Sequence, residues 1–122
     1  MLIETFRLHL RSWRESDREA FAAMNSDPDV MRDLGGPISR EQSDAKFDRY
    51  VAAWEKNSVG RWAIESTGGD FLGYAGVLES DSSHPLGRHY EAGWRLVRSA
   101  WGKGYATEAA KAALADSFTL WG

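Results

Sequence analysis

The residues with the clearest chemical potential form the six-residue stretch 101–106, which reads WGKGYA. It follows residues 90–97, where apolar residues recur every two positions as in a strand, and it precedes a run with helical periodicity. A helix that begins after glycines presents unpaired backbone N–H groups at its positive end, and such ends bind phosphate. Gly102 and Gly104 leave room for a ligand and can adopt positive φ. The stretch therefore predicts a phosphate-binding loop, with Lys103 adding charge at its rim.

Two better-known phosphate motifs do not fit this stretch. A P-loop has its lysine after the last glycine and before Ser or Thr, whereas Lys103 is followed by Gly104. A dinucleotide fingerprint needs a third glycine where Thr107 stands. On spacing alone, a Gly-Lys-Gly sequence fits a flexible turn equally well.

A longer match favours the phosphate interpretation. Gly93-Trp94-Arg95-Leu96 followed by WGKGYATEAA at 101–110 resembles the acetyl-CoA signature of the GNAT superfamily of N-acetyltransferases, in its RimJ/RimL-like branch. The opening ETFRLHLR at 4–11 is similar to the T-x-R-L-x-L-R opening of that branch. The family loop [R/Q]-x-x-G-x-[G/A] holds the coenzyme A pyrophosphate, with Trp101 here in the first place. The resemblance implies that these residues bind acetyl-CoA: Leu96, Val97, Arg98, Trp101, Gly102, Lys103, Gly104, Tyr105 and Ala106.

Within this set the resemblance assigns separate tasks. Backbone N–H groups near Leu96 and Val97 are expected to contact the pantetheine arm and the thioester carbonyl, and the Arg98 side chain is expected to add charge beside the loop. Glu108 lies in the first helical turn, where a carboxylate suits the helix dipole, and we interpret it as structural.

Acetyl transfer to an amine requires that the amine be neutral. At pH 7 this costs roughly 1–1.4 kcal/mol for an α-amino group and roughly 4.6 kcal/mol for a lysine. A carboxylate acting directly or through water therefore suffices for an α-amine. Glu91, near the start of the central strand, matches an acidic residue that the family often has there and is our predicted catalytic base. An exposed strand glutamate is also often only solvated, and Glu79, Asp81 and His89 are weaker candidates.

Composition narrows the function classes. A chain of 122 residues suits one domain, and its net charge of −3 argues against a nucleic-acid-binding surface. It contains no cysteine, so a disulfide, a thiolate metal site and a cysteine nucleophile are excluded. We expect no metal. No segment has the length of apolar sequence that spans a bilayer, so we expect no membrane partner and a cytoplasmic location.

The first part of the chain predicts a strand and two short helices. Residues 3–13 alternate as one half-exposed strand, with Phe6, Leu8 and Leu10 on one face and His9 solvated on the other. Residues 16 and 19, Ser and Glu, form a capping box for a helix. Asp27 and Pro28 begin a second helix that Gly35-Gly36 ends. In the family these helices cover the acceptor cleft and the loop between them helps to choose the substrate.

The middle of the chain predicts a longer helix and a hairpin. Ser39 and Gln42 form a capping box for a helix that runs to residues 56–57 and packs on the sheet. Residues 61–65 and 71–78 form a hairpin across the turn at 67–70. Gly73 and Gly76 indicate a bulge or a close backbone approach. Residues 79–89 form a polar loop.

Together these elements predict an α/β (α+β) fold with a GNAT-type mixed, mostly antiparallel sheet flanked by helices. Residues 1–122 are expected to be a single incomplete domain, because the family continues with a strand, a helix and two more strands. That part often supplies a tyrosine acid, a role we do not assign to Tyr105. Strand 90–97 is expected to be left as an open edge, so either the chain is truncated or a partner supplies the missing wall, for example a second copy of the chain.

The predicted function is an acetyl-CoA-dependent N-acetyltransferase. The acceptor is a primary amine, either a protein N-terminal α-amine or a small-molecule amine, which attacks directly in a ternary complex. The alternative is a non-catalytic acyl-CoA-binding or interaction module with the same loop. In a third interpretation the fold is unrelated and Gly-Lys-Gly is only a turn.

Overall fold

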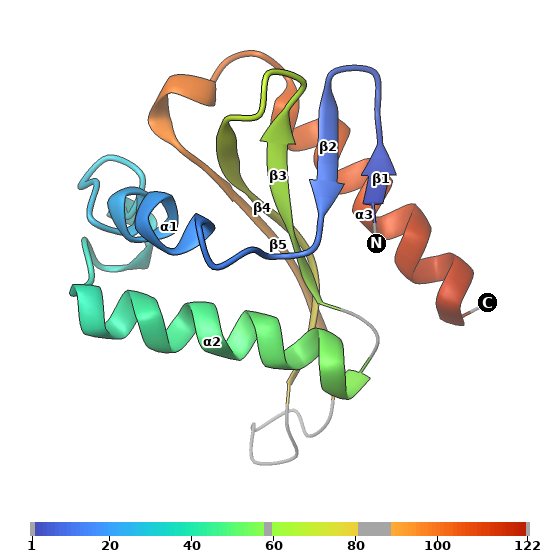
Figure 1. The fold of residues 1–122 in the computed structure, drawn as a ribbon, viewed down its shortest axis with the longest axis horizontal. Helices are drawn as coiled ribbons and strands as arrows, with labels where there is room; N and C mark the ends of the chain where they lie inside the picture. Colours follow the sequence, from blue (N-terminus) through green and yellow to red (C-terminus); the bar gives the residue numbers. More distant parts are fainter. Residues whose placement is uncertain (1, 58–59, 81–88, 122) are drawn as a thin grey trace.

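The computed structural model describes residues 2–57, 60–80 and 89–121, which form an antiparallel sheet between two helical layers. Its strand order is β1-β2-β3-β4-β5, so β1 and β5 are its edges. Helices α1 and α2 cover one face and α3 covers the other (Figure 1). The elements are β1 (Leu2–Glu4), β2 (Leu8–Arg11), α1 (Asp17–Asn25), η1 (Arg32–Leu34), α2 (Arg40–Asn57), β3 (Arg61–Ser66), β4 (Phe71–Ser80), β5 (His89–Leu96), η2 (Arg98–Ala100) and α3 (Tyr105–Trp121).

The predicted fold class is confirmed, and every pairing among the five described strands is antiparallel. The core has two parts because the sheet has two covered faces. On the α3 side, Leu8, Trp62 and Leu96 pack with the small residues of the helix. On the other side, Phe21 and Phe47 pack with rings and methionines from α1, α2 and the sheet, and both predicted core methionines, 24 and 31, are buried there.

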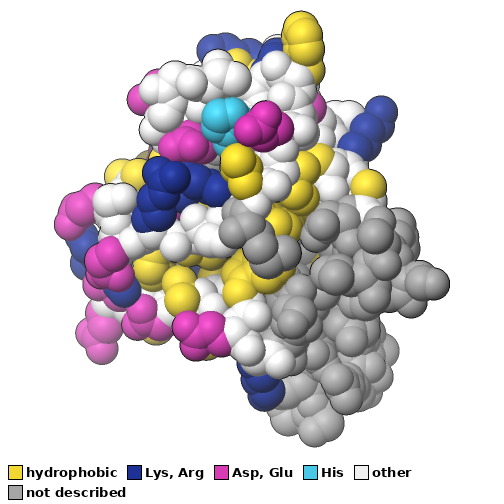
Figure 2. Space-filling model, turned by 45° about the vertical axis from the view of Figure 1, so that its right-hand side comes forward, with side chains coloured by type: hydrophobic (Ala, Val, Ile, Leu, Met, Phe, Trp, Pro, Cys, Tyr) yellow, Lys and Arg dark blue, Asp and Glu magenta, His cyan; other side chains and the backbone are white. Residues whose placement is uncertain are grey.

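The single strand expected over residues 3–13 is wrong, because this segment is a hairpin. Its strands β1 and β2 pair with each other, and the Thr5 N–H donates to the Leu8 carbonyl at 2.9 Å across the turn. Phe6 stands in that turn with 94% of its surface exposed, whereas Leu8 and Leu10 are fully buried. His9 is half-buried and lies 3.6 Å from the Glu65 carboxylate. On the face drawn in Figure 2, a histidine side chain lies next to acidic side chains.

The predicted capping boxes had different outcomes. At α2 the box is confirmed, since the Ser39 N–H donates to Gln42 Oε1 at 2.9 Å and the Gln42 N–H donates to Ser39 Oγ at 3.1 Å. At α1, Ser16 makes no side-chain cap hydrogen bond, so that prediction is wrong. The carboxylate of Asp17 takes over the polar contacts there, accepting bonds of 2.8 Å from Arg11.

The second short helix predicted from Asp27 is also wrong, because the segment consists of turns followed by the single-turn η1. Asp27 Oδ1 accepts from the Asp29 N–H at 2.9 Å, which stabilises a local turn rather than a helix. The predicted end of the segment is correct, since Gly35 has φ 90°. The connection between α1 and α2 is therefore mostly irregular backbone.

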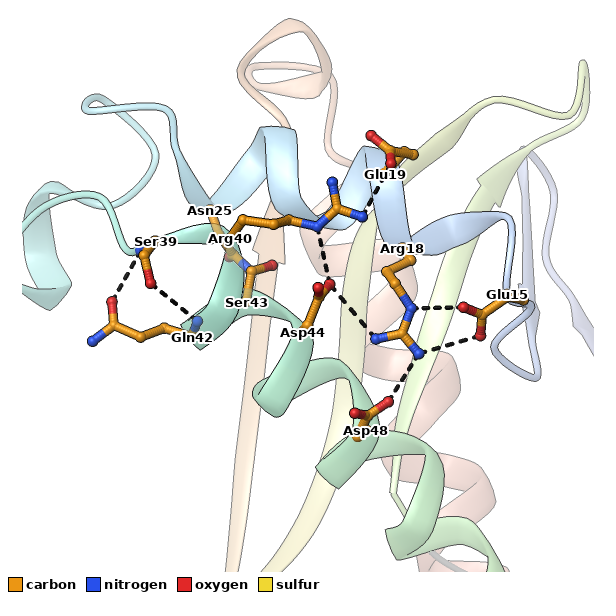
Figure 3. Close-up of polar contacts among 10 residues, drawn as sticks. All are labelled: Glu15, Arg18, Glu19, Asn25, Ser39, Arg40, Gln42, Ser43, Asp44 and Asp48. Carbon is orange, nitrogen blue, oxygen red and sulfur yellow. Dashed lines mark hydrogen bonds and ion pairs between the residues drawn. The ribbon is translucent and has the colours of Figure 1, made fainter.

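Ion pairs tie α1 to α2. Arg18 reaches Glu15, Asp44 and Asp48, and Arg40 joins Glu19 to Asp44 (Figure 3). Between the same helices, Asn25 donates to Ser43 Oγ at 3.1 Å in the buried interior. These contacts fix the two helices as one layer, from which the irregular connection extends toward the end of β5.

The predicted close backbone approach in β4 is confirmed. Gly73 has φ 146°, and a Cβ atom there would overlap the carbonyl oxygen of Arg95 on β5. Gly76 has φ 149°, and its Cβ atom would overlap the carbonyl oxygen of Gly60. These glycines let the strands beside the candidate site approach at a distance that no side chain would allow.

Candidate active site

The site begins where β5 ends and the chain passes through η2 and residues 101–104 into α3. Gly102 and Gly104 have φ of 76° and 78°, so the positive φ values expected at these glycines are present. The helical hydrogen-bond ladder begins with the Glu108 N–H, which donates to the Gly104 carbonyl at 3.1 Å. The amides just before Glu108 have no acceptor within the helix, because the first turn of a helix has none to offer. They form a cluster of donors at the positive end of α3.

The turn between β1 and β2 holds this loop from one side. Arg7 Nη1 donates to the Lys103 carbonyl at 2.7 Å, and its guanidinium lies 4.6 Å from the centre of the Tyr105 ring. Arg7 Nε donates to Glu108 Oε1 at 2.8 Å, and Thr5 Oγ1 donates to the same carboxylate. Burial would raise the pKa of Glu108, but these hydrogen bonds hold the pKa below its ordinary value. Glu108 thus has structural contacts, but its partners Thr5 and Arg7 in the first hairpin were not predicted from the sequence.

A cavity of about 380 Å³ opens at the free edge of β5. It brings three residues of the predicted coenzyme set together with residues from the connection between α1 and α2. That connection was expected to border the acceptor. Residues expected to contact the coenzyme and residues expected to contact the acceptor therefore line the same cavity. The lining residues are Val30, Asp33, Trp94, Arg95, Leu96, Trp101 and Ala106.

The backbone at the end of β5 separates the two predicted N–H contacts. The Val97 N–H donates to the Leu72 carbonyl at 2.8 Å, so the sheet uses this donor. In an antiparallel pair consecutive residues point to opposite sides, so the N–H and C=O of Leu96 face the free edge. The Leu96 carbonyl accepts from Trp101 Nε1 at 3.2 Å. Leu96 therefore presents an N–H toward the open edge, and Val97 does not.

Two arginines join this end of β5 to the connection between α1 and α2. Arg95 Nη1 donates to Asp33 Oδ1 at 2.9 Å and to the Val30 carbonyl at 2.7 Å. Arg98 Nη1 lies 2.8 Å from Asp29 Oδ2, so its charge is shared with that carboxylate. The hydrogen bond from Arg95 lowers the pKa of Asp33 below its ordinary value. Sequence reasoning missed Arg95 and Asp33 as a pair, because nothing in their spacing links residues so far apart.

The predicted coenzyme residues do not all share one space. Leu96, Trp101 and Ala106 line the cavity described above, whereas Val97 and Arg98 line a second cavity of about 400 Å³ on the α1 side. Gly102, Lys103 and Gly104 are exposed, and Tyr105 is half-buried beside Arg7. The predicted coenzyme residues are therefore divided between two cavities and the exposed surface of the loop rather than lining one continuous pocket.

The predicted base Glu91 lies in β5, where its backbone is opposite Leu78 of β4. Its side chain lies outside the described residues, as do the side chains of Glu79 and His89. Asp81 falls entirely outside them. The assignment of a base therefore stays a prediction.

Buried polar groups lie on the α2 side of β5, where the sequence predicted only core. Tyr74 pairs with Arg95 in the sheet, and its ring centre lies 5.3 Å from that of Tyr50. Burial would raise the pKa of Tyr74, but Lys46, Tyr50 and nearby arginines hold it below its ordinary value. Burial lowers the pKa of Lys46 itself. Lys46, Arg61 and Arg95 thus place positive charge near the buried Tyr74 ring.

Within the described ranges 2–57, 60–80 and 89–121, no group of three or more histidine or acidic side chains is arranged to hold a metal ion. None of their helices combines the length and apolar character needed to cross a membrane.

An antiparallel sheet with a glycine loop that opens a helix after its last strand defines an α/β fold with a helix N-terminus suited to a phosphate-bearing ligand. Comparison with known proteins identifies the family. Residues 7–121 match the acetyltransferase (GNAT) domain. The chain belongs to this family. The family prediction is confirmed, and the interpretation as an unrelated fold is wrong.

Relatives and solved structures agree with this assignment. The chain is 31% identical to the Bacillus subtilis protein YkkB, over 93% of this chain and 66% of YkkB. An acetyltransferase from Agrobacterium tumefaciens str. C58 superposes with a TM-score of 0.85 at 28% identity, over 97% of this chain and 67% of that one. The ribosomal L7/L12 α-N-protein acetyltransferase RimL, in complex with coenzyme A, superposes with a TM-score of 0.64 at 16% identity, over 97% of this chain and 67% of that one. The RimL likeness shows the fold alone, so the RimJ/RimL-like branch stays a prediction.

The chain spans about two thirds of the length of these proteins, 66% for YkkB and 67% for the Agrobacterium acetyltransferase. The activity, the substrates and the partners of the whole protein are therefore treated as proposals.

Proposed function

We propose that the chain is an acetyl-CoA-dependent N-acetyltransferase domain that transfers the acetyl group to a primary amine. The observation that supports this most strongly is the cavity at the free edge of β5, which joins Leu96, Trp101 and Ala106 to the acceptor-side residues Val30 and Asp33. Membership of the acetyltransferase (GNAT) family indicates acetyl-CoA as the coenzyme, and the structure of RimL, a protein of the same fold, contains coenzyme A.

In this proposal the coenzyme pyrophosphate binds the free amides at the start of α3. Each hydrogen bond from a neutral N–H to a charged oxygen contributes about 1.5–3 kcal/mol. The pantetheine arm then extends along the free edge of β5, where the Leu96 N–H donates to the thioester carbonyl oxygen. The Trp101 indole, held on the Leu96 carbonyl, forms the wall between the two parts.

The acceptor amine enters between the connection of α1 with α2 and the end of β5. Asp33 is 69% exposed there and its lowered pKa keeps it charged, so it suits an approaching ammonium better than the removal of a proton. Glu91 acts as the base. At about 3.3 Å per residue, the five positions that separate Glu91 from Leu96 span about 16 Å along the strand, so the proton reaches Glu91 through a chain of several waters.

The chemical step is a direct attack in a ternary complex. The amine nitrogen bonds to the thioester carbonyl carbon, the carbon–sulfur bond breaks, and the thiolate leaves. Glu91 first takes one proton from the ammonium through a chain of waters, and after the attack the nitrogen gives its second proton to the leaving thiolate. The Leu96 N–H stabilises the charge that develops on the carbonyl oxygen. The acceptor is either a protein N-terminal α-amine or a small-molecule amine.

The test compares Glu91→Gln with wild type for acetyl-CoA affinity and for turnover on a panel of α-amine peptides and small amines. We expect unchanged affinity and turnover reduced by roughly 10²–10⁴, the usual contribution of a general base. Glu4→Gln, at an exposed strand position, is the matched control and should behave as wild type.

Each other outcome contradicts a defined part of the proposal. Unchanged turnover in Glu91→Gln would exclude Glu91 as the base. Wild type that binds acetyl-CoA but transfers acetyl to no amine would favour the alternative, a non-catalytic acyl-CoA-binding module.

A further inference from the structure

Arg7 is the side chain outside the loop that holds it most closely. It comes from the turn between β1 and β2, and its contacts reach both the loop and the first turn of α3: the Lys103 carbonyl, the Tyr105 ring and the Glu108 carboxylate. Arg7 Nη2 also lies near Gly104, where it is 3.3 Å from the position that a Cβ atom would occupy. The family motif of the loop includes none of these contacts, and sequence analysis assigned Arg7 no role.

The bond to the Lys103 carbonyl fixes the direction of one amide. In a trans peptide the C=O and the following N–H point in opposite directions, and the described chain has no cis peptide. The Lys103 carbonyl points at Arg7, so the Gly104 N–H points away from Arg7, toward the side where an anion can approach. A charged donor on the carbonyl also polarises the peptide and makes its N–H a stronger donor.

This peptide needs such a constraint because of its neighbours. The peptide turns about ψ of Lys103 and φ of Gly104; Gly104 has φ 78°, and glycine can rotate between positive and negative φ at little steric cost. Without the Arg7 bond, the Lys103–Gly104 peptide could turn its carbonyl toward the phosphate, which would repel it. The coenzyme would then have to restore the orientation at its own cost.

Glu108 in turn holds Arg7 in place. Its carboxylate accepts from Arg7 Nε at 2.8 Å, from the Arg7 backbone N–H at 2.9 Å and from Thr5 Oγ1. The Glu108 side chain is 18% exposed and that of Arg7 is 38% exposed, so the pair is partly shielded from water. The guanidinium is thus fixed at both ends before any ligand binds.

We propose that Arg7 is a positioning residue for coenzyme binding, which orients the Lys103–Gly104 peptide so that the Gly104 N–H faces the coenzyme pyrophosphate. This inference rests on the proposed function, since it presumes that the loop binds acetyl-CoA. It adds a residue from the first hairpin, 96 positions before the loop carbonyl that it holds, to the determinants of coenzyme affinity.

Isothermal titration calorimetry with acetyl-CoA tests the proposal on wild type, Arg7→Gln and Arg7→Lys. We expect about 10- to 30-fold weaker binding for Arg7→Gln, the effect of one misdirected charged hydrogen bond. Arg7→Lys keeps the positive charge but loses the guanidinium donors that bond Lys103 and Glu108 at the same time. Its affinity for acetyl-CoA should therefore lie between those of wild type and Arg7→Gln. Arg40→Gln, an arginine in exposed ion pairs on α2, is the matched control and should bind as wild type.

A second ligand separates positioning from direct contact. Dephospho-coenzyme A lacks the 3′-phosphate but keeps the pyrophosphate, so Arg7→Gln should weaken its binding by the same factor. If the loss disappears with this ligand, Arg7 contacts the 3′-phosphate itself and the positioning role is wrong. In nitrogen-15 NMR spectra, the large downfield shift expected for the Gly104 amide on coenzyme binding should shrink in Arg7→Gln.

Glu108→Gln is the control for an effect on folding. It leaves Arg7 its bond to the Lys103 carbonyl and should weaken coenzyme binding less than Arg7→Gln does. If Arg7→Gln does not fold, Glu108→Gln and Arg7→Lys still decide the question, since wild-type affinity in both would overturn the proposal. Wild-type binding with equal affinity in Arg7→Gln would overturn this inference and leave the proposed function standing. No binding by wild type would overturn both.

Discussion

At the residue scale, Gly73 shows most directly how the sequence controls the site. Gly73→Ala should destabilise the fold by about 2–4 kcal/mol, because the new Cβ atom overlaps the Arg95 carbonyl at a positive φ. Gly69→Ala is the matched control, since φ there is 94° but no other heavy atom lies within 4 Å. It should cost only about 1 kcal/mol of backbone strain. Urea unfolding measures both, and equal losses would contradict the close approach as the cause.

The residues of the loop were predictable from sequence, and the contacts that hold it were not. The positions of Gly102 and Gly104 indicate the loop because the need for glycine at a positive φ depends only on the local turn. The pairs Arg95–Asp33 and Arg7–Glu108 join segments 62 and 101 positions apart. Alternation and helical period show which face a side chain occupies, but not which distant side chain lies opposite.

At the element scale, the first hairpin is joined to the start of α3 through Glu108. The folded pKa of this carboxylate lies below its ordinary value of 4.5, so the ionised form contributes stability above that pH. The contribution is lost as pH falls through the folded pKa. Glu108→Gln lacks this contribution at every pH.

We therefore expect the stability difference between wild type and Glu108→Gln to be largest near pH 6 and to shrink by pH 3. Urea unfolding at both pH values measures it. Glu55→Gln, at an exposed position on α2, is the control and should show a smaller change. A stability difference that stays constant or grows toward pH 3 would contradict a stabilising contribution from the ionised Glu108 carboxylate.

Elements stabilised locally were predicted better than elements stabilised by distant contacts. The capping box of α2 uses Ser39 and Gln42 alone, and it forms as expected. The same pattern before α1 fails because Asp17, the next residue, is buried against Arg11. The turn around Phe6 was missed because alternation continues through it unchanged.

At the scale of the whole molecule, the resemblance rather than periodicity led to the expectation of an open edge at residues 90–97, and the full strand order was not predicted. The observed order makes β5 one edge of the sheet, directly beside the cavity and the loop. Pairing of this edge with a second copy of the chain stays a prediction, and so does the cytoplasmic location. The amine acceptor is equally open between proteins and small molecules, because a cavity wall of Val30 and Asp33 suits both.

A thermal melt with and without acetyl-CoA tests most directly whether this chain binds the coenzyme. A ligand at about 100 times its dissociation constant stabilises a fold by about 2.7 kcal/mol, which raises the melting midpoint of a domain of this size by several degrees. We predict such a shift for wild type. A cooperative melt whose midpoint does not change at millimolar acetyl-CoA would contradict coenzyme binding by the chain.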